Sequence, residues 1–506
     1  MEPSVPTSST PSQGDETIFI QDFILEGADQ FPEAKLRELL APYKERNLTL
    51  AQIREAADLL TKFYRENGYM VATAFIPPQD ARSGKLLIRV QIGRYGQKSL
   101  ENQSLVRDQY FQNALKYLQA GAPIRSSELE RLVLLIGDLP GADIPKLSMS
   151  EGQAPGTADF LTRVPPKSRF GGYFIADNSG SRYTGRRRFM AGVDVNSPFN
   201  LGDRLSVNGL ISENRGLQSV GLNYSFPLSA NGLRLELAYF NVFSRLGEEY
   251  EDLEVTGKAD IYQATLSYPL IRRGDRNLRL SLTVAHKQME DKFIDVLRRK
   301  ISYLSLNLEN QKWTTLLGKN FFAQLGGALT VGRLTLPDPL QKRQNQNGAN
   351  SVGNYAKFNL NGALGFSLTN NLILQGLANF QKSLTGNLDS SEQMSVTGQT
   401  GVRAYREIIS GDEGYYLATD LVYNLPGLGD FRHSLGIFAD ISGWRYKNGS
   451  YALKDSDTLS GAGLSYTATF EPFTLSLQLT RALGSYPEEI KNDGRTHLLA
   501  KLVAVF

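Results

Sequence analysis

The sequence predicts a transmembrane β-barrel of about 16 antiparallel strands, preceded by two small α+β domains. Residues 167–506 alternate apolar and polar side chains with the period of two that β-strands have. The connections between these runs are alternately short and long, as in outer-membrane barrels, which have turns at one end and loops at the other. Residues 17–166 instead mix helical and strand periods, which is typical of α+β domains.

The composition of the 506-residue chain limits the classes of protein to which it can belong. No run of about 18 apolar residues is present, so we expect no transmembrane helix. Barrel strands do not produce such a run, because their lipid-facing side chains alternate with polar ones. The contents of 25 Phe, 23 Tyr and 47 Gly suit such strands. The absence of Cys excludes disulfides and cysteine metal sites, and a net charge of +3 does not suggest nucleic acid binding.

The start of the chain is rich in Ser, Pro and Thr, which predicts a disordered linker over residues 1–16. It contains no basic segment followed by an apolar core, so no secretory signal peptide is present in this sequence. An outer-membrane protein needs such a signal. Either the start is processed or engineered, or the barrel prediction is wrong.

The first α+β domain is predicted over residues 17–94. Thr49 is a good N-cap, and Gln52 three residues later completes a capping box for a helix. Pro32 suits the first turn of the helix before it. The predicted elements are a strand over 17–26, a helix over 32–40, a helix from Thr49, and strands over 69–76 and 85–92.

The second α+β domain is predicted over residues 95–166 and repeats the same order more faintly. Ser126 is its clearest N-cap, and Pro165-Pro166 marks its end. The predicted elements are a strand over 95–100, helices over 106–118 and 126–139, and strands over 143–150 and 157–164.

The connections distinguish a membrane barrel from a soluble β-sandwich, whose strands also alternate. Residues 394–399 could form an additional strand, but the number of strands would then be odd, so this segment is assigned to a loop. The short connections include 200–203, 229–232, 316–320, 369–371, 427–430 and 471–472; among the long ones are 244–256, 290–299, 334–352, 383–414, 445–456 and 484–495.

The long connection over residues 383–414 carries the candidate functional residues. Arg403 lies between Val402 and Tyr405, which favours a packed location, and a charge removed from water needs a partner. Asp440, in a later strand, is the best candidate for that partner. The alternative is an exposed arginine on a mobile loop.

The final strand ends in Phe506, on the same face as Ala504, Leu502 and Leu498. We expect this strand to pair with the first one and close the barrel, because closure removes the exposed sheet edge. A buried last strand of a soluble domain is the alternative.

The first domain resembles the polypeptide-transport-associated (POTRA) domain of the two-partner secretion transporters (the TpsB family, hemolysin-secretion type), within the BamA-like superfamily. The matching segments are FILEGADQF, NLTLAQIREAADLLTKFYRENGYMVATAFIPPQ and LLIRVQIGRYG, with the GY…A…P-Q pattern at Gly68, Tyr69, Ala74, Pro77 and Gln79. The resemblance implies that residues 17–94 are POTRA 1, that residues 95–166 are POTRA 2, and that the remainder is an outer-membrane barrel.

The barrel segment resembles the same superfamily in three motifs. Its V-R-G-Y loop motif corresponds to Val402, Arg403, Ala404 and Tyr405, with Ala404 in place of Gly. The resemblance implies that the loop folds into the lumen and that Arg403 contacts Asp440. The other matches are Gly411, Asp412 and Gly414 (G-D-x-G), Asp420 where Glu is common, and Phe438 and Asp440 (F-x-D-x-G, with Ser442 in the Gly position).

The resemblance implies secretion of an unfolded exoprotein of TpsA type, with an N-terminal secretion domain, by a protein whose POTRA domains lie in the periplasm. The cargo could be a hemolysin, an adhesin or a contact-dependent toxin. Other implied partners are outer-membrane lipid, lipopolysaccharide and the barrel-assembly machinery; a monomer without a cofactor is expected. Family members often begin with a pore-plugging helix, which residues 1–15 do not provide.

The substrate surface is predicted on POTRA 1, where an extended peptide could add a strand to a sheet edge. The candidates are Phe19, Gln21 and Phe23 on the first strand, and Leu59 and Phe63 on the second helix. Residues of these types are more often ordinary core.

Several other functions were weighed against transport. The nearest is a general BamA- or TamA-like insertase of the same superfamily. A passive porin needs no periplasmic domains, and a soluble binding protein would not need the pattern of connections. We expect no enzyme, because the three His lie in separate strands and neither a Gly-x-Ser-x-Gly motif nor a nucleotide-binding G-x-x-x-x-G-K-[ST] motif is present.

Overall fold

The structure is a computed structural model that describes residues 17–427, 429–484, 486–487 and 494–506, apart from the side chain of Gln399. The predicted linker over residues 1–16 lies outside the described residues. The chain forms two compact units. The first contains residues up to 103 together with 108–137 and 144–165, and the second contains 104–107, 138–143 and 166–506.

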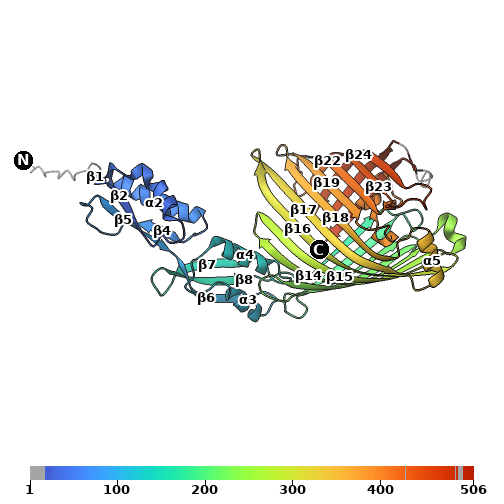
Figure 1. The fold of residues 1–506 in the computed structure, drawn as a ribbon, viewed down its shortest axis with the longest axis horizontal. Coiled ribbons are helices and arrows are strands. Elements are labelled where there is room, and N and C mark those ends of the chain that lie inside the picture. Colours follow the sequence, from blue (N-terminus) through green and yellow to red (C-terminus); the bar gives the residue numbers. More distant parts are fainter. Residues whose placement is uncertain (1–16, 428, 485, 488–493) are drawn as a thin grey trace, which may run out of the picture. The chain divides into compact units, whose positions relative to one another are not determined.

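The first domain of unit 1 packs two helices on a three-stranded sheet of order β2-β5-β4 (Figure 1). Helix α2 buries Ile53, Ala57, Leu60 and Tyr64, which have the helical spacing of an amphipathic face. Its capping box is present as predicted: Gln52 N donates to Thr49 Oγ1 over 3.2 Å, and Thr49 N donates to Gln52 Oε1 over 2.9 Å. The elements are β1 (Thr17–Ile20), β2 (Asp22–Glu26), α1 (Glu33–Leu40), η1 (Ala41–Tyr43), β3 (Arg46–Thr49), α2 (Leu50–Glu66), β4 (Ala72–Phe75) and β5 (Lys85–Ile92).

The strand predicted over residues 17–26 is in fact two strands in different sheets. β1 pairs with β3, whereas β2 pairs in parallel with β5. Ile20 and Phe23 are both buried, although residues three apart on one strand point to opposite faces. The chain therefore changes sheets at Gln21, whose N–H donates to the Gly84 carbonyl over 2.7 Å.

The second domain of unit 1 has the predicted order of elements. Its sheet has the order β6-β8-β7, with β6 parallel to β8. Helix α4 buries Leu129, Leu132 and Ile136 along one face. The elements are β6 (Arg94–Asn102), α3 (Asp108–Leu115), α4 (Ser126–Gly137), β7 (Lys146–Glu151) and β8 (Thr157–Val164).

Unit 2 contains a closed barrel of 16 antiparallel strands, drawn from green to red in Figure 1. The order follows the chain, except that β19 pairs directly with β22, so residues 394–399 lie outside the barrel wall as predicted. The strands are β9 (Phe170–Asp177), β10 (Arg188–Asn196), β11 (Arg204–Ser212), β12 (Leu217–Pro227), β13 (Arg234–Arg245), β14 (Thr256–Arg272), β15 (Arg276–Lys292), β16 (Val296–Leu316), β17 (Lys319–Thr335), β18 (Gly353–Ser367), β19 (Leu372–Ser383), β22 (Glu413–Asn424), β23 (Arg432–Arg445), β24 (Ser456–Phe470), β25 (Phe473–Leu483) and β26 (Thr496–Val505).

The outer face of the barrel is apolar. On β16, Leu304, Leu306 and Leu308 are 42%, 49% and 46% exposed, while the intervening Ser305 is buried and hydrogen-bonded to Thr330 on β17. A soluble protein rarely exposes such a continuous apolar surface, which in a barrel faces lipid. Among the described helices, none has the length and apolar character needed to cross a membrane.

The barrel closes between β9 and β26, and Phe506 takes part in the closure as predicted. β26 pairs with β9 from Lys501 to Val505. Gly172 N donates to the Phe506 carbonyl over 2.7 Å, and Phe506 N donates to the Gly172 carbonyl over 3.0 Å. Backbone hydrogen bonds therefore leave neither strand with an open edge at this point.

Two long connections differ from the prediction. Residues 290–299 do not form a loop, because β15 and β16 extend until only residues 293–295 separate them. The backbone pairing of β15 with β16 continues to Lys292 and Val296, and the exposed pair of Glu290 with Arg298 lies across this extension. The connection over 334–352 contains a short helix, α5 (Pro339–Asn347), which begins at the N-cap Asp338.

Candidate functional site in the barrel lumen

The connection between β19 and β22, residues 384–412, lies against the inner face of the barrel; we call it the long loop. On β23, Ile437 and Ile441 are 56% and 41% exposed and face outward. Phe438 and Asp440, which alternate with them, are nearly fully buried and contact Arg403 of the loop. Because successive side chains of a strand point to opposite faces, the loop lies in the lumen. The small strands β20 (Met394–Ser395) and β21 (Ser410–Gly411) pair within it.

Arg403 lies between two carboxylates of the barrel wall. Its Nε donates to Asp440 Oδ2 over 2.9 Å and its Nη2 to Asp440 Oδ1 over 2.7 Å, while its backbone N also donates to Asp440 Oδ2 over 3.0 Å. Nη1 and Nη2 donate to the two oxygens of Asp420 over 2.8 and 3.0 Å. The guanidinium also lies 3.7 Å from the ring centre of Phe438, a favourable cation–π distance. The structure thus brings together Arg403, Phe438 and Asp440, as the sequence predicted.

The contact between Arg403 and Asp420 was not predicted. Asp420 of β22 lies opposite Phe438 of β23, and Ala418 lies opposite Asp440. The two aspartates are therefore diagonal neighbours on the inner face. The sequence shows that Asp420 and Ala418, two residues apart, lie on the same face of their strand. It does not show which residues of β23 lie opposite them, so the contact could not be predicted.

The environment of Arg403 keeps it charged. Burial lowers the pKa of the guanidinium, but hydrogen bonds to Asp440 and then Asp420 outweigh burial and leave the pKa above its ordinary value. The Asp440 side chain is fully covered, so the loss of Arg403 would leave a buried charge without its cation. The ion pair is thus costly to open in the closed arrangement.

Ala404, where the family motif has Gly, packs against a glycine of the wall. Ala404 and Val402 are both fully buried, and a Cβ atom added at Gly461 of β24 would lie 2.9 Å from Ala404 Cβ. The methyl group of Ala404 therefore fills the space that Gly461 leaves open. The sequence gave no indication of this pairing, because an isolated glycine in a strand has many possible roles.

Tyr405 fixes the other side of the loop. It is fully buried, its hydroxyl donates to the Ser460 carbonyl of β24 over 3.4 Å, and its ring stacks on Tyr486 at 5.3 Å between ring centres. Val402, Ala404 and Tyr405 form one apolar cluster with Tyr416 and Leu459. The Arg403 side chain thus points to the carboxylates of Asp440 and Asp420, while the residues next to it in the loop pack against the barrel wall.

The predicted secondary motif forms the neck of the long loop. Asp412 is fully buried; its Oδ1 accepts from Leu388 N over 2.8 Å, and its Oδ2 accepts from Lys447 N over 2.9 Å. It therefore joins the two ends of the loop to the connection after β23. A Cβ atom at Gly411 would lie 2.9 Å from the Arg445 carbonyl oxygen, and one at Gly414 would lie 2.9 Å from that of Gly443. Both glycines permit a close approach to β23.

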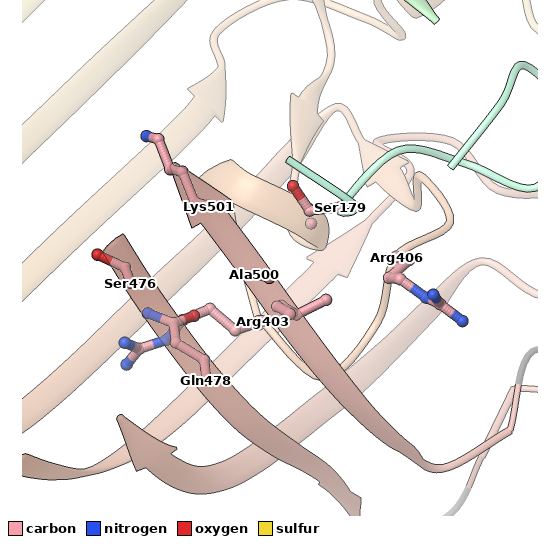
Figure 2. A pocket seen from close by; sticks show the side chains of 9 residues that line it. Ser179, Arg403, Arg406, Ser476, Gln478, Ala500 and Lys501 are labelled. Atoms are coloured by element: carbon pink, nitrogen blue, oxygen red, sulfur yellow. The ribbon is translucent and has the colours of Figure 1, made fainter. Parts of the chain in front are cut away.

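A cavity of about 390 Å³ lies beside the loop, between Arg403 and the last two strands (Figure 2). Its lining is mixed and includes Ser476 and Gln478 of β25 and Leu499 and Lys501 of β26. The inner face near the barrel closure is therefore not filled by the loop. Among the described residues, no group of His, Cys, Asp or Glu side chains is arranged to hold a metal ion.

The predicted substrate residues of POTRA 1 differ in exposure. Phe23 is 1% exposed and belongs to the hydrophobic core, so its assignment to a binding surface is wrong: β2 turns that side chain into the core of the first domain. Phe19 is 53% exposed and Gln21 is also exposed. Leu59 and Phe63 are partly exposed, and Phe63 packs edge-on against Phe31 at 4.9 Å.

Comparison with known families assigns the chain. Residues 156–468 match the model of the haemolysin secretion/activation protein ShlB/FhaC/HecB, which covers more than half of the sequence. The chain belongs to this family. Residues 18–93 match the ShlB-type POTRA domain. The protein is thus an outer-membrane transporter of the two-partner secretion type, as predicted, and the insertase alternative is disfavoured.

Two similar relatives are transporters. The heme/hemopexin transporter protein HuxB of Haemophilus influenzae (strain 86-028NP) is 26% identical over 449 residues, which cover 86% of this chain and 78% of the relative. The outer membrane transporter CdiB of Escherichia coli is 24% identical over 522 residues, covering 98% and 85%.

Solved structures show the same fold. CdiB from Escherichia coli superimposes with a TM-score of 0.77 at 20% identity, over 99% of this chain and 93% of that structure. BamA from Haemophilus ducreyi lacking POTRA domains 1–3 gives 0.53 at 14% identity, over 97% and 100%. The family member described here thus shares its fold with CdiB and with BamA.

Proposed function

We propose that this transporter passes an unfolded exoprotein through the barrel lumen and that the long loop gates the passage. The observation that carries the proposal is the position of Arg403, which holds a lumenal loop against the wall through Asp440 and Asp420. A chain could pass only after this loop shifts, because the loop occupies the interior. The cavity beside Arg403 provides space next to the closed position.

The partner is proposed as a TpsA-type exoprotein with an N-terminal secretion domain. It would reach the POTRA domains in the periplasm and could add an extended strand beside the exposed Phe19 and Gln21. Folding of the exoprotein outside the cell would supply the free energy, and no chemical reaction is involved. We further propose that the transporter is a monomer, is inserted by the barrel-assembly machinery and contacts lipopolysaccharide at its outer rim.

Single-channel conductance in planar bilayers tests the gate. The wild type should give low, flickering conductance, and replacement of residues 384–412 by a short glycine linker should make it large and steady. Replacement of residues 293–295, the turn between β15 and β16, by glycines is the control and should leave the flicker unchanged. Large, steady conductance of the wild type would place the loop outside the pore, and no conductance in any variant would contradict a transport channel.

Secretion provides the second test. Candidate exoproteins from the same genome should appear outside cells that contain the wild-type transporter and remain inside cells that contain Arg403→Ala, while the barrel is still inserted. Equal secretion in both strains would exclude Arg403 as part of the gate.

A further inference from the structure

A cavity of about 420 Å³ opens on the outer face of the barrel wall and crosses β19, β22, β23 and β24; we call it the outer groove. Phe380, Tyr415, Gly443 and Thr458 line it from these four strands, each opposite the next. Gly443 lies two residues from Ile441, which faces outward, so the row that it belongs to faces outward as well. The outer groove is therefore separate from the lumen.

The outer groove lies at the end of the barrel that carries the long connections. The long loop joins β19 to β22, residues 446–455 join β23 to β24, and the groove residues lie next to these connections. Long connections of outer-membrane barrels lie on the cell surface. The groove thus faces the outer leaflet, whose characteristic lipid is lipopolysaccharide, an acylated and phosphorylated saccharide.

Aromatic side chains form the part of the outer groove that is nearer to the middle of the membrane. Phe380 and Tyr415 are 40% and 36% exposed, and the outward-facing Ile441 continues the apolar surface toward the middle of the wall. A Cβ atom added at Gly443 would lie only 2.5 Å from Tyr415 Cε1, so the ring of Tyr415 lies over this glycine. Aromatic residues favour the boundary between lipid tails and head groups. This part of the groove suits an acyl chain.

The other edge of the outer groove is basic. Lys382 and Arg445 line it, and both are exposed. Lys382 lies two residues after Phe380 and therefore on the same outward face. Among the residues that the structure describes, no carboxylate forms an ion pair with Lys382. A cation at the edge of the lipid-facing surface can thus accept an anionic partner from the membrane.

Two carboxylates also line the outer groove, but each already has a lysine partner. Glu413 Oε1 accepts from Lys447 Nζ over 3.0 Å, and its Oε2 accepts from Arg445 Nε over 2.7 Å. Asp457 Oδ2 accepts from Lys454 Nζ over 2.6 Å. The surroundings of the groove therefore keep an excess of positive charge, which suits an anion.

We propose that the outer groove binds lipid A, the acylated and phosphorylated disaccharide of lipopolysaccharide. An acyl chain lies between Phe380 and Tyr415, and a phosphate accepts charge-assisted hydrogen bonds from Lys382 and Arg445. A phospholipid has similar chemistry, but the groove faces the leaflet that contains lipopolysaccharide. The inference gives a location to the lipopolysaccharide contact proposed above, and it does not depend on the passage of an exoprotein.

Native mass spectrometry of the full chain, delipidated in detergent and titrated with lipid A that carries two phosphates, tests the charged edge. The wild type should retain one lipid A. Lys382→Gln should weaken the affinity about tenfold, because one charge-assisted hydrogen bond is lost. Lys342→Gln is the matched control, since Lys342 is an exposed lysine of α5 that does not line the groove. Heat-modifiable migration shows that each barrel is folded.

A variant that fills the outer groove tests the acyl-chain part without a change of charge. Thr458→Trp should weaken lipid A binding several-fold, because its indole ring occupies the groove. Thr419→Trp is the control, because Thr419 is also exposed on the outer face but does not line the groove. Wild-type affinity in both Lys382→Gln and Thr458→Trp would overturn the inference.

Two further ligands separate lipid A from other lipids. Lipid A without phosphates should bind the wild type about as weakly as intact lipid A binds Lys382→Gln. Phosphatidylglycerol, which supplies an anionic phospholipid, should bind more weakly than lipid A. Equal binding of phosphatidylglycerol would overturn the assignment to lipopolysaccharide. If the wild type binds no lipid A, the lipopolysaccharide contact of the proposed function fails too, whereas binding that neither groove variant weakens refutes only the groove.

Discussion

The methyl group of Ala404 lies in the space left by the missing side chain of Gly461. A Cβ atom at Gly461 would lie 2.9 Å from Ala404 Cβ and 3.0 Å from Val402 Cγ1, closer than real Cβ contacts. Gly461→Ala should therefore displace Val402 and Ala404 of the long loop from the wall and raise the mean conductance several-fold while the barrel remains folded. Crowding of a packed site typically costs about 1–3 kcal/mol.

The pair offers its own compensation test. Gly461→Ala combined with Ala404→Gly should recover most of the wild-type conductance, since the larger clash is removed. Gly365→Ala on β18, where an added Cβ atom meets nothing within 4 Å, is the control and should have no effect. A double variant as leaky as Gly461→Ala alone would exclude this contact as the cause.

Replacement of Arg403 tests whether this residue holds the long loop in place as a latch or supports the folding of the barrel. Arg403→Ala should leave barrel insertion intact and abolish secretion, although it leaves Asp440 buried without its cation, a loss of about 3–5 kcal/mol for the closed arrangement. Arg403→Lys should retain only part of the function, because an ammonium group cannot replace a guanidinium that bonds two carboxylates. Heat-modifiable migration in gels measures the folded barrel. Its loss in Arg403→Ala would show a structural role instead.

The two aspartates should not be equivalent. The Asp440 side chain is fully covered and also accepts from the Arg403 backbone, whereas the Asp420 side chain is 21% exposed. Asp440→Asn should therefore reduce secretion more than tenfold, and Asp420→Asn only a few-fold, since an exposed partner contributes less. Pulse-chase secretion measures both. A larger effect of Asp420→Asn would mean that Asp420 is the main partner of Arg403.

The sequence predicted those features that depend on local periodicity. The alternation of apolar and polar residues and the lengths of the connections were sufficient to predict a barrel of about 16 strands. The apolar face that ends in Phe506 was sufficient to predict that the last strand closes it. The pairing of Arg403 with Asp440 was also predicted: the residue types made Asp440 the best candidate for the partner, and the family resemblance implied the contact. The α5 helix was missed, since its polar residues have no apolar face to reveal a helical period.

The unpredicted parts of the site depend on register between distant segments. Lys287 and Lys357 appear in the sequence as ordinary polar residues of alternating strands, and Glu392 as one of many polar loop residues. Only the closed barrel brings them together. The division of residues 17–26 was hidden for the same reason, because the partner that interrupts the strand, Gly84, lies far along the chain.

Asp22 should make the stability of the first domain depend on pH. Hydrogen bonds from Lys44 and, more weakly, Arg37 lower the pKa of Asp22 well below its ordinary value despite some burial. A carboxyl group with a lowered pKa in the folded state stabilises the fold above its unfolded-state pKa, and this contribution is lost as the pH falls toward the folded-state pKa. Asp22→Asn should thus weaken the domain at pH 7 by no more than about 1 kcal/mol, because the site is partly exposed.

Urea unfolding at several pH values measures this contribution, followed by circular dichroism of the helices, most of which lie in unit 1. The difference between wild type and Asp22→Asn should be largest near neutral pH and shrink below the ordinary pKa range of aspartate, where the Asp22 carboxylate of the unfolded state becomes protonated while that of the folded state is still ionised. Asp80→Asn, in an exposed pair with Arg82 at 3.8 Å, is the control and should be neutral. A difference between wild type and Asp22→Asn that stays constant into strong acid would show that the asparagine alters packing rather than charge.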